Sequence, residues 1–498
     1  MVKSDGRLTD DLDSSDHPPR DACGVFGAWC PGEDVGKLAY YGLYALQHRG
    51  QESAGIAVSD GERIVVYKDM GLVAQVFDEA ALNTLRGHIA VGHCRYSTAG
   101  SSVWDNAQPT FRATATGGVA LGHNGNLINT LELGARLAAA REHGAGGPAG
   151  GLPRAAPAAT SDTDVLTALF ASPPGGAGPG GVEEAAFVTL RLARGAFSLV
   201  FMDEKTLYAA RDPQGFRPLV LGRLARGWVV ASETAALDIV GAELTREVEP
   251  GELISIDERG VRTRSFASPE PKGCLFEYVY LARPDTTIAG RGVHATRVEV
   301  GRRLAAEHPA RADLVIPVPE SGTPAAIGYA EASGIPYGQG LVKNSYVGRT
   351  FIQPSQTIRE RGIKLKLNPL RDAIAGKRVV VVDDSIVRGT TQRAIVAMLR
   401  EAGAAEVHVR ISSPPVAWPC FYGIDFARRD ELIAGRESVA EIMATIGADS
   451  LGYVSLEGLI AATTVPAGEL CHACFDGRYP IPVAEAERGK HVLEDIRS

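Results

Sequence analysis

Two adjacent carboxylates stand at the end of a strongly apolar run. The segment KRVVVVDDSIVRGTTQRAIVAML places Asp383 and Asp384 after four valines and before a small-residue loop and a helical pattern. A run this apolar is typical of a parallel sheet, where ligands bind beyond the carboxyl ends of the strands. Carboxylates there can bind ribose hydroxyls or a hydrated Mg²⁺, and the helix N-terminus suits a phosphate. A capped helix with both acids in solvent remains the alternative.

The loop after these acids carries polar groups that could surround a terminal phosphate. They are Ser385, Arg388, Gly389, Thr390 and Thr391. A second loop, IPVPESGTPAA, places Ser321 before another helical pattern, which suits pyrophosphate or ordinary helix capping. The basic stretch between the loops includes Lys343 and Arg349, and it is either a solvated face or a lid over the phosphates. The segment lacks GxxxxGK(S/T) and GxGxxG, which counts against a triphosphate P-loop and a dinucleotide fold.

Seven cysteines are spread along the chain. An odd, sparse set without a secretion signal does not indicate a disulfide framework, so a nucleophile or metal ligands are the roles to consider. Cys23 heads the first expected strand, where it is either an apolar core residue or a nucleophile. Four others are enough for a closed tetrahedral metal set: Cys274, Cys420, Cys471 and Cys474. We expect Cys30 and Cys94 to be core thiols.

The elements that position these residues differ between the two halves. Up to about residue 252, short β-rich runs predict an all-antiparallel or layered α/β/β/α domain, interrupted by helical patterns at 36–46 and 162–170. The Gly, Pro and Ala-rich tracts at 141–160 and 172–181 predict surface loops. After a Pro-bearing junction, apolar strands alternate with helical patterns, which predicts a doubly wound α/β domain with a parallel sheet. The three helical patterns span residues 292–307, 323–332 and 390–402.

The composition is that of a globular protein, with 498 residues of which 45% are hydrophobic and 22% charged. This length predicts about three domains, or two large ones. The net charge of −8 argues against binding to nucleic acid or to an anionic membrane. The chain has neither a membrane-spanning run nor, in residues 1–22, the apolar segment of a signal peptide, so we expect a cytoplasmic protein.

Several strings in the first half together resemble the class II, N-terminal-nucleophile glutamine amidotransferases. They are ACGVFG, LQHRGQESAGIA, GHCRYSTAG, LGHNGNL and SDTDVL. The resemblance implies that residues 1–22 are a propeptide, that residues 23–260 form the glutaminase domain, and that Cys23 becomes the N-terminal nucleophile. A thiol with a pKa of about 8.5 would then share a residue with an α-amine of pKa about 8, which can accept its proton.

The same resemblance assigns four further residues of the glutaminase site. It implies that Asn124 and Gly125 form the oxyanion hole, that Arg95 binds the α-carboxylate of glutamine, and that Asp162 binds its α-ammonium group. The long tract before Asp162 departs from the compact pattern of the family.

The string VVVVDDSIVRGTT resembles the phosphoribosyl-pyrophosphate (PRPP) loop of type I phosphoribosyltransferases. This implies a phosphoribosyltransferase domain over residues 274–470. PRPP would be bound by Ser321, Lys343, Arg349, Asp383, Asp384, Ser385, Arg388, Gly389, Thr390 and Thr391. One Mg²⁺ per subunit would be held by Ser321, Asp383 and Asp384.

The strings KGCLFEYVYLARPD and WPCFYGID, with CHAC, resemble the amidotransferase branch that carries a [4Fe-4S] cluster. The resemblance implies one cluster per subunit, on Cys274, Cys420, Cys471 and Cys474, and a C-terminal segment over residues 471–498 that supplies two of these ligands. Zinc and unligated thiols remain the alternatives.

Taken together, the two halves resemble the glutamine PRPP amidotransferases. Their reaction would convert glutamine, PRPP and water into 5-phosphoribosylamine, glutamate and pyrophosphate, for purine biosynthesis. The resemblance also implies a homo-oligomer, a homotetramer by analogy, with purine nucleotides as feedback inhibitors. Glucosamine-6-phosphate and asparagine synthases share only the first half. A PRPP-sensing protein with an inactive glutaminase domain is the alternative from another class.

Overall fold

The first half of the chain forms two stacked antiparallel sheets in a computed structural model that describes residues 23–96, 102–114, 117–142, 161–172, 181–344, 367–424 and 428–483. One sheet has the order β11 (Glu243–Glu247), β9 (Val220–Leu224), β10 (Gly227–Ala231), β1 (Gly24–Trp29), β4 (Ile89–Arg95), β2 (Ser53–Ser59) and β3 (Ile64–Met70). The other has the order β13 (Gly260–Ser265), β12 (Glu252–Asp257), β8 (Leu207–Arg211), β7 (Gly195–Met202), β6 (Gly118–Leu127) and β5 (Thr110–Ala113).

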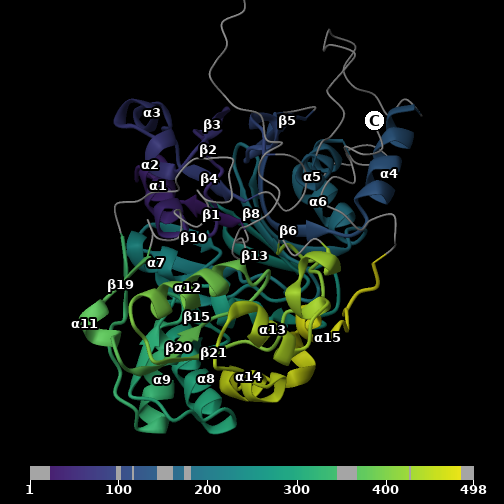
Figure 1. Cartoon of the computed structure of the whole chain (residues 1–498). Helices are drawn as coiled ribbons and strands as arrows, with labels where there is room; N and C mark the ends of the chain where they lie inside the picture. The colour runs from purple at the N-terminus through teal and green to yellow at the C-terminus, as the bar shows by residue number, and fades with distance from the viewer. Residues whose placement is uncertain are drawn as a thin grey trace, which may run out of the picture.

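Helices cover both outer faces of this pair of sheets (Figure 1). On the first sheet lie α1 (Val35–Ala45), α2 (Val73–Val76), α3 (Glu79–Thr84) and α7 (Thr234–Val240). On the second lie α4 (Thr130–Glu142), α5 (Asp162–Ala171) and α6 (Gly181–Leu190). A third apolar core fills the space between the sheets, because Val25 faces inward while Phe26 faces the helices. The α/β/β/α prediction is confirmed. In this half the sequence pattern had missed α4, α6 and α7 and the two short helices α2 and α3.

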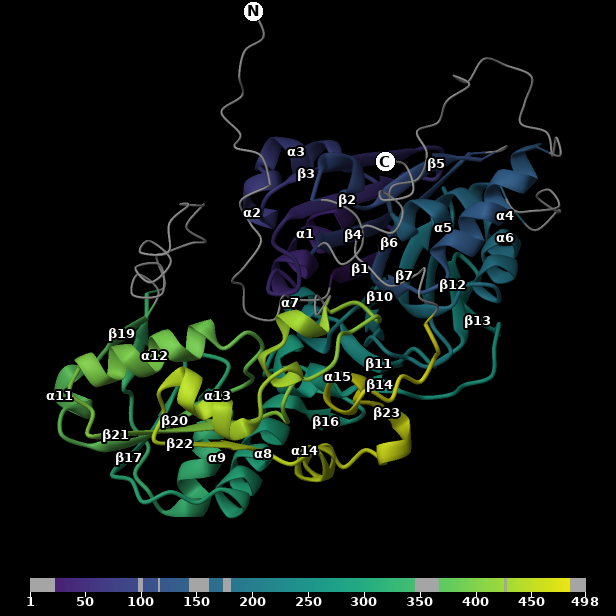
Figure 2. The ribbon, with the colours of Figure 1, turned by 45° about the vertical axis from the view of Figure 1, so that its right-hand side comes forward.

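The second half is built around a four-stranded parallel sheet. Its order is β17 (Leu314–Pro317), β20 (Arg378–Asp383), β21 (Glu406–Ile411) and β22 (Ser450–Tyr453). One face packs on α8 (Val293–Glu307), α9 (Thr323–Ser333) and α14 (Leu456–Thr463), and the other on α11 (Arg371–Ile374), α12 (Thr390–Glu401) and α13 (Val439–Ile446) (Figure 2). Val380 and Val382 enter one core and Val379 and Val381 the other, so the valine run is buried on both faces. The predicted doubly wound domain is confirmed.

Short elements complete this half and join it to the first. They are β14 (Gly273–Cys274), β15 (Thr287–Ile288), β16 (Arg291–Gly292), β18 (Leu341–Lys343), β19 (Leu367–Pro369), β23 (Leu470–Cys471), α15 (Ala473–Asp476), a π-helical turn (Glu277–Leu281) and 3₁₀ turns at Arg429–Glu431, Ile433–Gly435 and Ala467–Glu469. The first half has one further 3₁₀ turn among its described residues, at Trp104–Asn106. The β14–β23 pair and α15 lie between the two halves (Figure 2).

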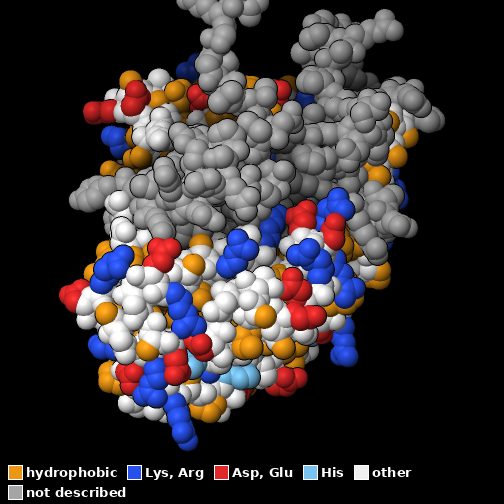
Figure 3. Space-filling view, viewed as in Figure 1, with side chains coloured by type: hydrophobic (Ala, Val, Ile, Leu, Met, Phe, Trp, Pro, Cys, Tyr) orange, Lys and Arg blue, Asp and Glu red, His pale blue; other side chains and the backbone are white. Residues whose placement is uncertain are grey.

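The surface of the second half carries both signs of charge. On the face seen in Figure 3, Lys and Arg side chains are interspersed with Asp and Glu. No helix in the described ranges is long and apolar enough to cross a membrane.

Candidate active sites

Cys23 lies immediately before β1 and is 5% exposed. Its thiol donates to the Tyr96 carbonyl at 3.1 Å, and the Tyr96 backbone N–H donates to Sγ at 3.4 Å. The register that pairs Gly24 with Cys94 brings the end of β4 to this point. Burial raises the pKa of the Cys23 thiol to about 11, although the contact with Tyr96 and the charge of Arg95 oppose this rise. The thiol therefore needs a base before it can act as a nucleophile at neutral pH.

Asn124 and Gly125 lie on β6, which faces β1 and β4 across the inner core. A Cβ atom at Gly122 would be 3.6 Å from both Val25 and His93, so the strands are in close contact two residues away from Cys23 and Asn124. Asn124 is fully buried, and neither its side-chain nitrogen nor its oxygen has a hydrogen-bond partner among the described residues. An unsatisfied buried amide costs about 1–3 kcal/mol, so these atoms are best explained by a bound ligand.

Gly125 has a backbone conformation that excludes any side chain. Its φ is +148°, and a Cβ atom would lie 2.1 Å from the carbonyl oxygen of Ala196 on β7. The HNG string therefore requires glycine for steric reasons. The strand can consequently present the backbone of Gly125 next to the Asn124 amide.

Arg95 and Asp162 approach the thiol from two elements. Arg95 ends β4, is 2% exposed, and has its guanidinium 3.8 Å from the Glu52 carboxylate. Asp162 begins α5 and accepts hydrogen bonds from the backbone of Leu127 at 3.1 Å and of Thr163 at 2.8 Å. After burial and the Tyr96 contact, Arg95 lowers the pKa of Cys23 while Glu52 and Asp162 raise it. Both predicted residues thus lie within electrostatic reach of Cys23, and Glu52 is a neighbour that the motif analysis missed.

Asp383 and Asp384 lie at the carboxyl end of β20, each 6% exposed. One oxygen of Asp383 accepts from the backbone of Asp384 at 2.9 Å, and the other accepts from the side-chain amide of Gln392 on α12. Ser385 Oγ donates to Asp384 at 2.6 Å. Burial, followed by repulsion from Asp384, raises the pKa of Asp383 well above its usual range. A cation at this strand end would relieve that cost.

The other predicted phosphate residues surround the same edge of the sheet. Val318 donates from its backbone to Val382 at 2.8 Å, and a Cβ at Gly322 would lie 2.3 Å from the same carbonyl, so the Ser321 loop contacts the end of β20. Lys343 on β18 points toward this loop, with Nζ 3.9 Å from Glu320. Gly389 caps α12, whose first residues are Thr390 and Thr391.

Two of the predicted PRPP-binding residues are not placed at this strand end by the structure. Arg388 forms an ion pair with Glu431, a partner that the sequence pattern did not indicate. Arg349 lies outside the described residues, as do residues 1–22 and most of the 141–160 and 172–181 tracts.

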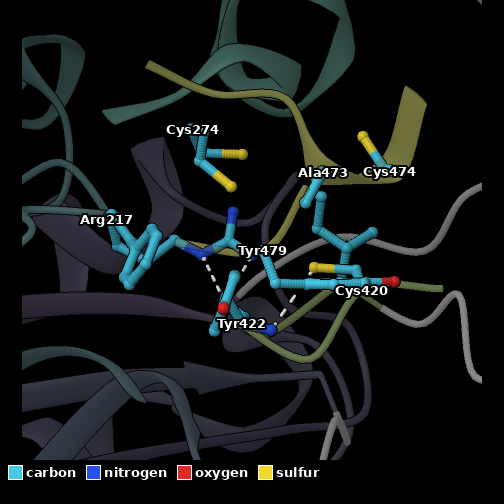
Figure 4. Close-up of a pocket in the computed structure, with 10 residues that line it drawn as sticks. Arg217, Cys274, Cys420, Tyr422, Ala473, Cys474 and Tyr479 are labelled. Carbon is cyan, nitrogen blue, oxygen red and sulfur yellow. Dashed lines mark hydrogen bonds between the residues drawn. The ribbon is translucent and has the colours of Figure 1, made fainter. Parts of the chain in front are cut away.

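The four predicted metal-site cysteines line one cavity. The parallel β14–β23 pair sets Cys274 opposite Cys471, while Cys474 comes from α15 and Cys420 from the segment after β21. The cavity is also lined by Arg217 (Figure 4). Burial raises the pKa of Cys274 to about 11 and those of Cys471 and Cys474 above their usual range. No group of three or more His, Cys, Asp or Glu in the described ranges could hold a single metal ion.

A buried charge network, which no motif indicated, joins the halves next to this cavity. Arg49 pairs with Glu233 of its own half and, at 2.6 Å, with Glu277 of the other. Arg217 pairs with Glu277 at 3.2 Å and donates twice to the Tyr422 carbonyl. The four charged side chains are at most 2% exposed.

Comparisons with known proteins identify the chain. The family model described as glutamine amidotransferase domain matches residues 93–238, and that of the phosphoribosyl transferase domain matches residues 295–412. The amidophosphoribosyltransferase of Mycobacterium tuberculosis is 65% identical over 486 residues, which cover 96% of this chain and 90% of that protein. The chain belongs to the amidophosphoribosyltransferase family. The amidophosphoribosyltransferase of Synechococcus elongatus is 51% identical, with 98% of both chains covered.

Solved amidophosphoribosyltransferase structures share the fold. A glutamine PRPP amidotransferase from B. subtilis, complexed with ADP and GMP, matches with a TM-score of 0.85 at 45% identity and covers 94% of this chain and 100% of that chain. The predicted reaction is confirmed: the enzyme uses glutamine, PRPP and water to form 5-phosphoribosylamine for purine biosynthesis. The matches in both halves decide against the synthases that share only the first half.

Proposed function

We propose that Cys23 is the nucleophile of the glutaminase half-reaction and that Asn124 and Gly125 form its oxyanion hole. The observation that carries this proposal is the buried Asn124 amide, which has no partner among the described residues and lies on the strand facing the Cys23 region. Arg95 and Asp162 hold the α-carboxylate and α-ammonium of glutamine, because their opposite charges converge on the thiol.

The steps of amide hydrolysis follow from these positions. Cys23 Sγ attacks the amide carbon of glutamine as its proton passes to a base. Cleavage before Cys23, with residues 1–22 as a propeptide, supplies an α-amine of pKa about 8 that can take this proton through a water. Asn124 and Gly125 donate to the developing oxyanion, which is worth several kcal/mol. The C–N bond then breaks, the nitrogen takes a proton and leaves as ammonia, and water hydrolyses the γ-glutamyl thioester to glutamate.

The second half-reaction takes place at the end of β20. Asp383 and Asp384 bind the ribose hydroxyls, and Ser385, Gly389, Thr390 and Thr391 bind the 5-phosphate at the start of α12. The Ser321 loop and Lys343 hold the pyrophosphate. Arg349 and Arg388 complete the basic surroundings, with Arg388 exchanging Glu431 for phosphate. Ammonia attacks C1 of the ribose, the bond to pyrophosphate breaks, and the product amine loses a proton.

Mg²⁺ fits this site because two nearly buried carboxylates and the Ser321 loop provide the oxygen donors that it prefers. We assign Ser321, Asp383 and Asp384 to one ion per subunit. When bound, the ion neutralises charge on the leaving pyrophosphate.

A [4Fe-4S] cluster, one per subunit, fits the four-cysteine cavity. The donors are four thiols that line one cavity, and thiolates are the ligands that such clusters use. When bound, the cluster would cross-link Cys274 and Cys420 to Cys471 and Cys474 and close long loops of the chain.

Several further properties belong to the proposal. The glutaminase domain spans residues 23–260 and the phosphoribosyltransferase domain residues 274–470, followed by the segment 471–498. The enzyme acts in the cytoplasm as a homo-oligomer, without nucleic-acid or membrane partners. Purine nucleotides inhibit it, which is supported by the B. subtilis enzyme complexed with ADP and GMP.

The nucleophile assignment is tested by separating the two nitrogen sources. Cys23→Ser should abolish synthesis from glutamine and retain synthesis from high ammonia, because only the first site is damaged. Cys30→Ser is the matched control, since Cys30 is also buried, directly follows the other end of β1 and lies outside the site. Glutamine-dependent activity that survives in Cys23→Ser, at the level of the Cys30→Ser control, would overturn the assignment.

A further inference from the structure

One loop of the second half touches the backbone of the proposed oxyanion hole. The segment Cys420–Gly423 begins at the four-cysteine cavity, and Gly423 ends it against Gly125 of β6. Gly423 has a φ of +99°, and a Cβ atom there would lie 3.0 Å from the carbonyl carbon and 3.1 Å from the Cα of Gly125. No room therefore exists for even a methyl group unless Gly125 moves by a few tenths of an ångström.

Residues on either side of this contact fix the loop to the first half. The side-chain amide of Asn126, next to Gly125, donates to the Phe421 carbonyl at 3.0 Å. Arg217 donates to the Tyr422 carbonyl from Nε at 3.1 Å and from a terminal nitrogen at 2.9 Å. Phe216 stacks on the Tyr422 ring with centroids 4.3 Å apart. The loop is thus anchored by backbone-directed contacts both to the strand of the oxyanion hole and to the residues before β9.

Because these contacts are rigid, the loop restricts the position of the Gly125 backbone. Arg217 is fully buried, and its guanidinium also pairs with Glu277, so it cannot follow a displaced loop at low cost. At Gly125 itself, the carbonyl of Ala196 occupies the space where a Cβ would point. Gly125 is therefore in close contact with both β7 and the Gly423 loop.

We propose that Gly423 is a positioning residue for glutaminase catalysis, which holds the Gly125 backbone in the oxyanion hole from the other half of the chain. This inference rests on the proposed role of Gly125. It makes glutamine hydrolysis dependent on the docking of the second half and on the segment that carries Cys420. The atoms nearest Gly423 belong to Gly125 and Arg217 rather than to the proposed PRPP ligands, so synthesis from ammonia should not require this contact.

The substitution Gly423→Ala tests this role. We expect the glutaminase kcat to fall about tenfold with little change in the KM for glutamine, since small misplacements of catalytic groups cost rate rather than ground-state binding. Ammonia-dependent synthesis should stay unchanged. The matched control is Gly447→Ala, because Gly447 has a φ of +75° and nothing within 4 Å of its Cβ position, so it has the backbone strain without the contact. Asn126→Ala should lower kcat in the same direction without introducing strain.

The results distinguish a positioning role of Gly423 from the role of the oxyanion hole itself. A Gly423→Ala enzyme that matches Gly447→Ala in glutaminase kcat, while Asn126→Ala is also unaffected, would overturn the positioning role. Equal losses of glutamine- and ammonia-dependent activity with a lower melting temperature than Gly447→Ala would also overturn it, since the role would then be structural. Asn124→Ala tests the oxyanion hole itself: full glutaminase activity in that variant would refute the proposed function instead.

Discussion

Replacing Glu277 with glutamine should destabilise the junction between the two halves. The Glu277 carboxylate is 2% exposed and accepts from Arg49 at 2.6 Å and from Arg217 at 3.2 Å. Glutamine keeps the shape and one acceptor oxygen, but its NH₂ group faces a guanidinium donor. The network then holds two buried positive charges against the single carboxylate of Glu233.

The magnitude follows from the burial of the partners. Removing one member of a buried ion pair costs about 3–5 kcal/mol, because the remaining charge loses its compensation. At roughly 2–4 °C per kcal/mol for a domain of this size, the apparent midpoint of thermal unfolding should fall by about 10 °C. An exposed pair provides the control: Arg302 and Glu331 are 2.8 Å apart, with side chains 48% and 51% exposed. Glu331→Gln should cost about 0–1 kcal/mol.

The assay compares the two variants with the parent enzyme by thermal and urea unfolding, with activity from each nitrogen source measured in parallel. As temperature or urea concentration rises, Glu277→Gln should lose glutamine-dependent synthesis earlier than ammonia-dependent synthesis, because the charge network contacts the loop that ends at Gly423. A midpoint for Glu277→Gln within 2 °C of that for Glu331→Gln would refute the assignment of a buried, mutually compensating network.

Three further predictions concern separate parts of the chain. Asp384→Asn should lower the rate of synthesis from PRPP by about tenfold or more with either nitrogen donor. Initial rates at varied PRPP concentration that equal those of the parent enzyme would contradict the proposed PRPP site. Burial raises the pKa of Glu233, but Arg49 and His48 outweigh this and hold it below its usual range. The ionised Glu233 carboxylate therefore contributes fully to the free energy of unfolding above about pH 4.3, the usual pKa of Glu, and this contribution is lost as the pH falls toward the lower pKa of the folded state. The stability of Glu233→Gln should consequently fall less steeply with decreasing pH than that of the parent enzyme. Anaerobically purified enzyme should be brown with about four iron and four sulfide per chain; Cys420→Ser should lower both, and a colourless zinc-containing enzyme would establish the zinc alternative.

Local patterns were sufficient wherever the chemistry depends on neighbours in the chain. A run of valines buried on both faces specifies a central parallel strand, and the end of that strand fixes where Asp383 and Asp384 lie. Likewise, the HNG string on β6 places Asn124 beside a glycine whose φ of +148° admits no side chain. The helices α4 and α6 were less predictable, because both adjoin Gly and Pro-rich tracts: α4 ends in the tract at 141–160, and α6 begins at the end of the one at 172–181.

Only the tertiary structure decided which distant residues meet. Cys274 and Cys471 are paired through two-residue strands too short to be recognised in a sequence. Arg49 and Glu277 are 228 positions apart, and nothing in the sequence around either residue distinguishes it from a charged residue on the surface. Gly423 has no distinctive spacing to Gly125, yet the two halves pack so closely there that a Cβ atom at Gly423 would lie 3.0 Å from the Gly125 carbonyl carbon. Such contacts depend on how the two halves pack, which burial and shape complementarity determine and no local spacing encodes.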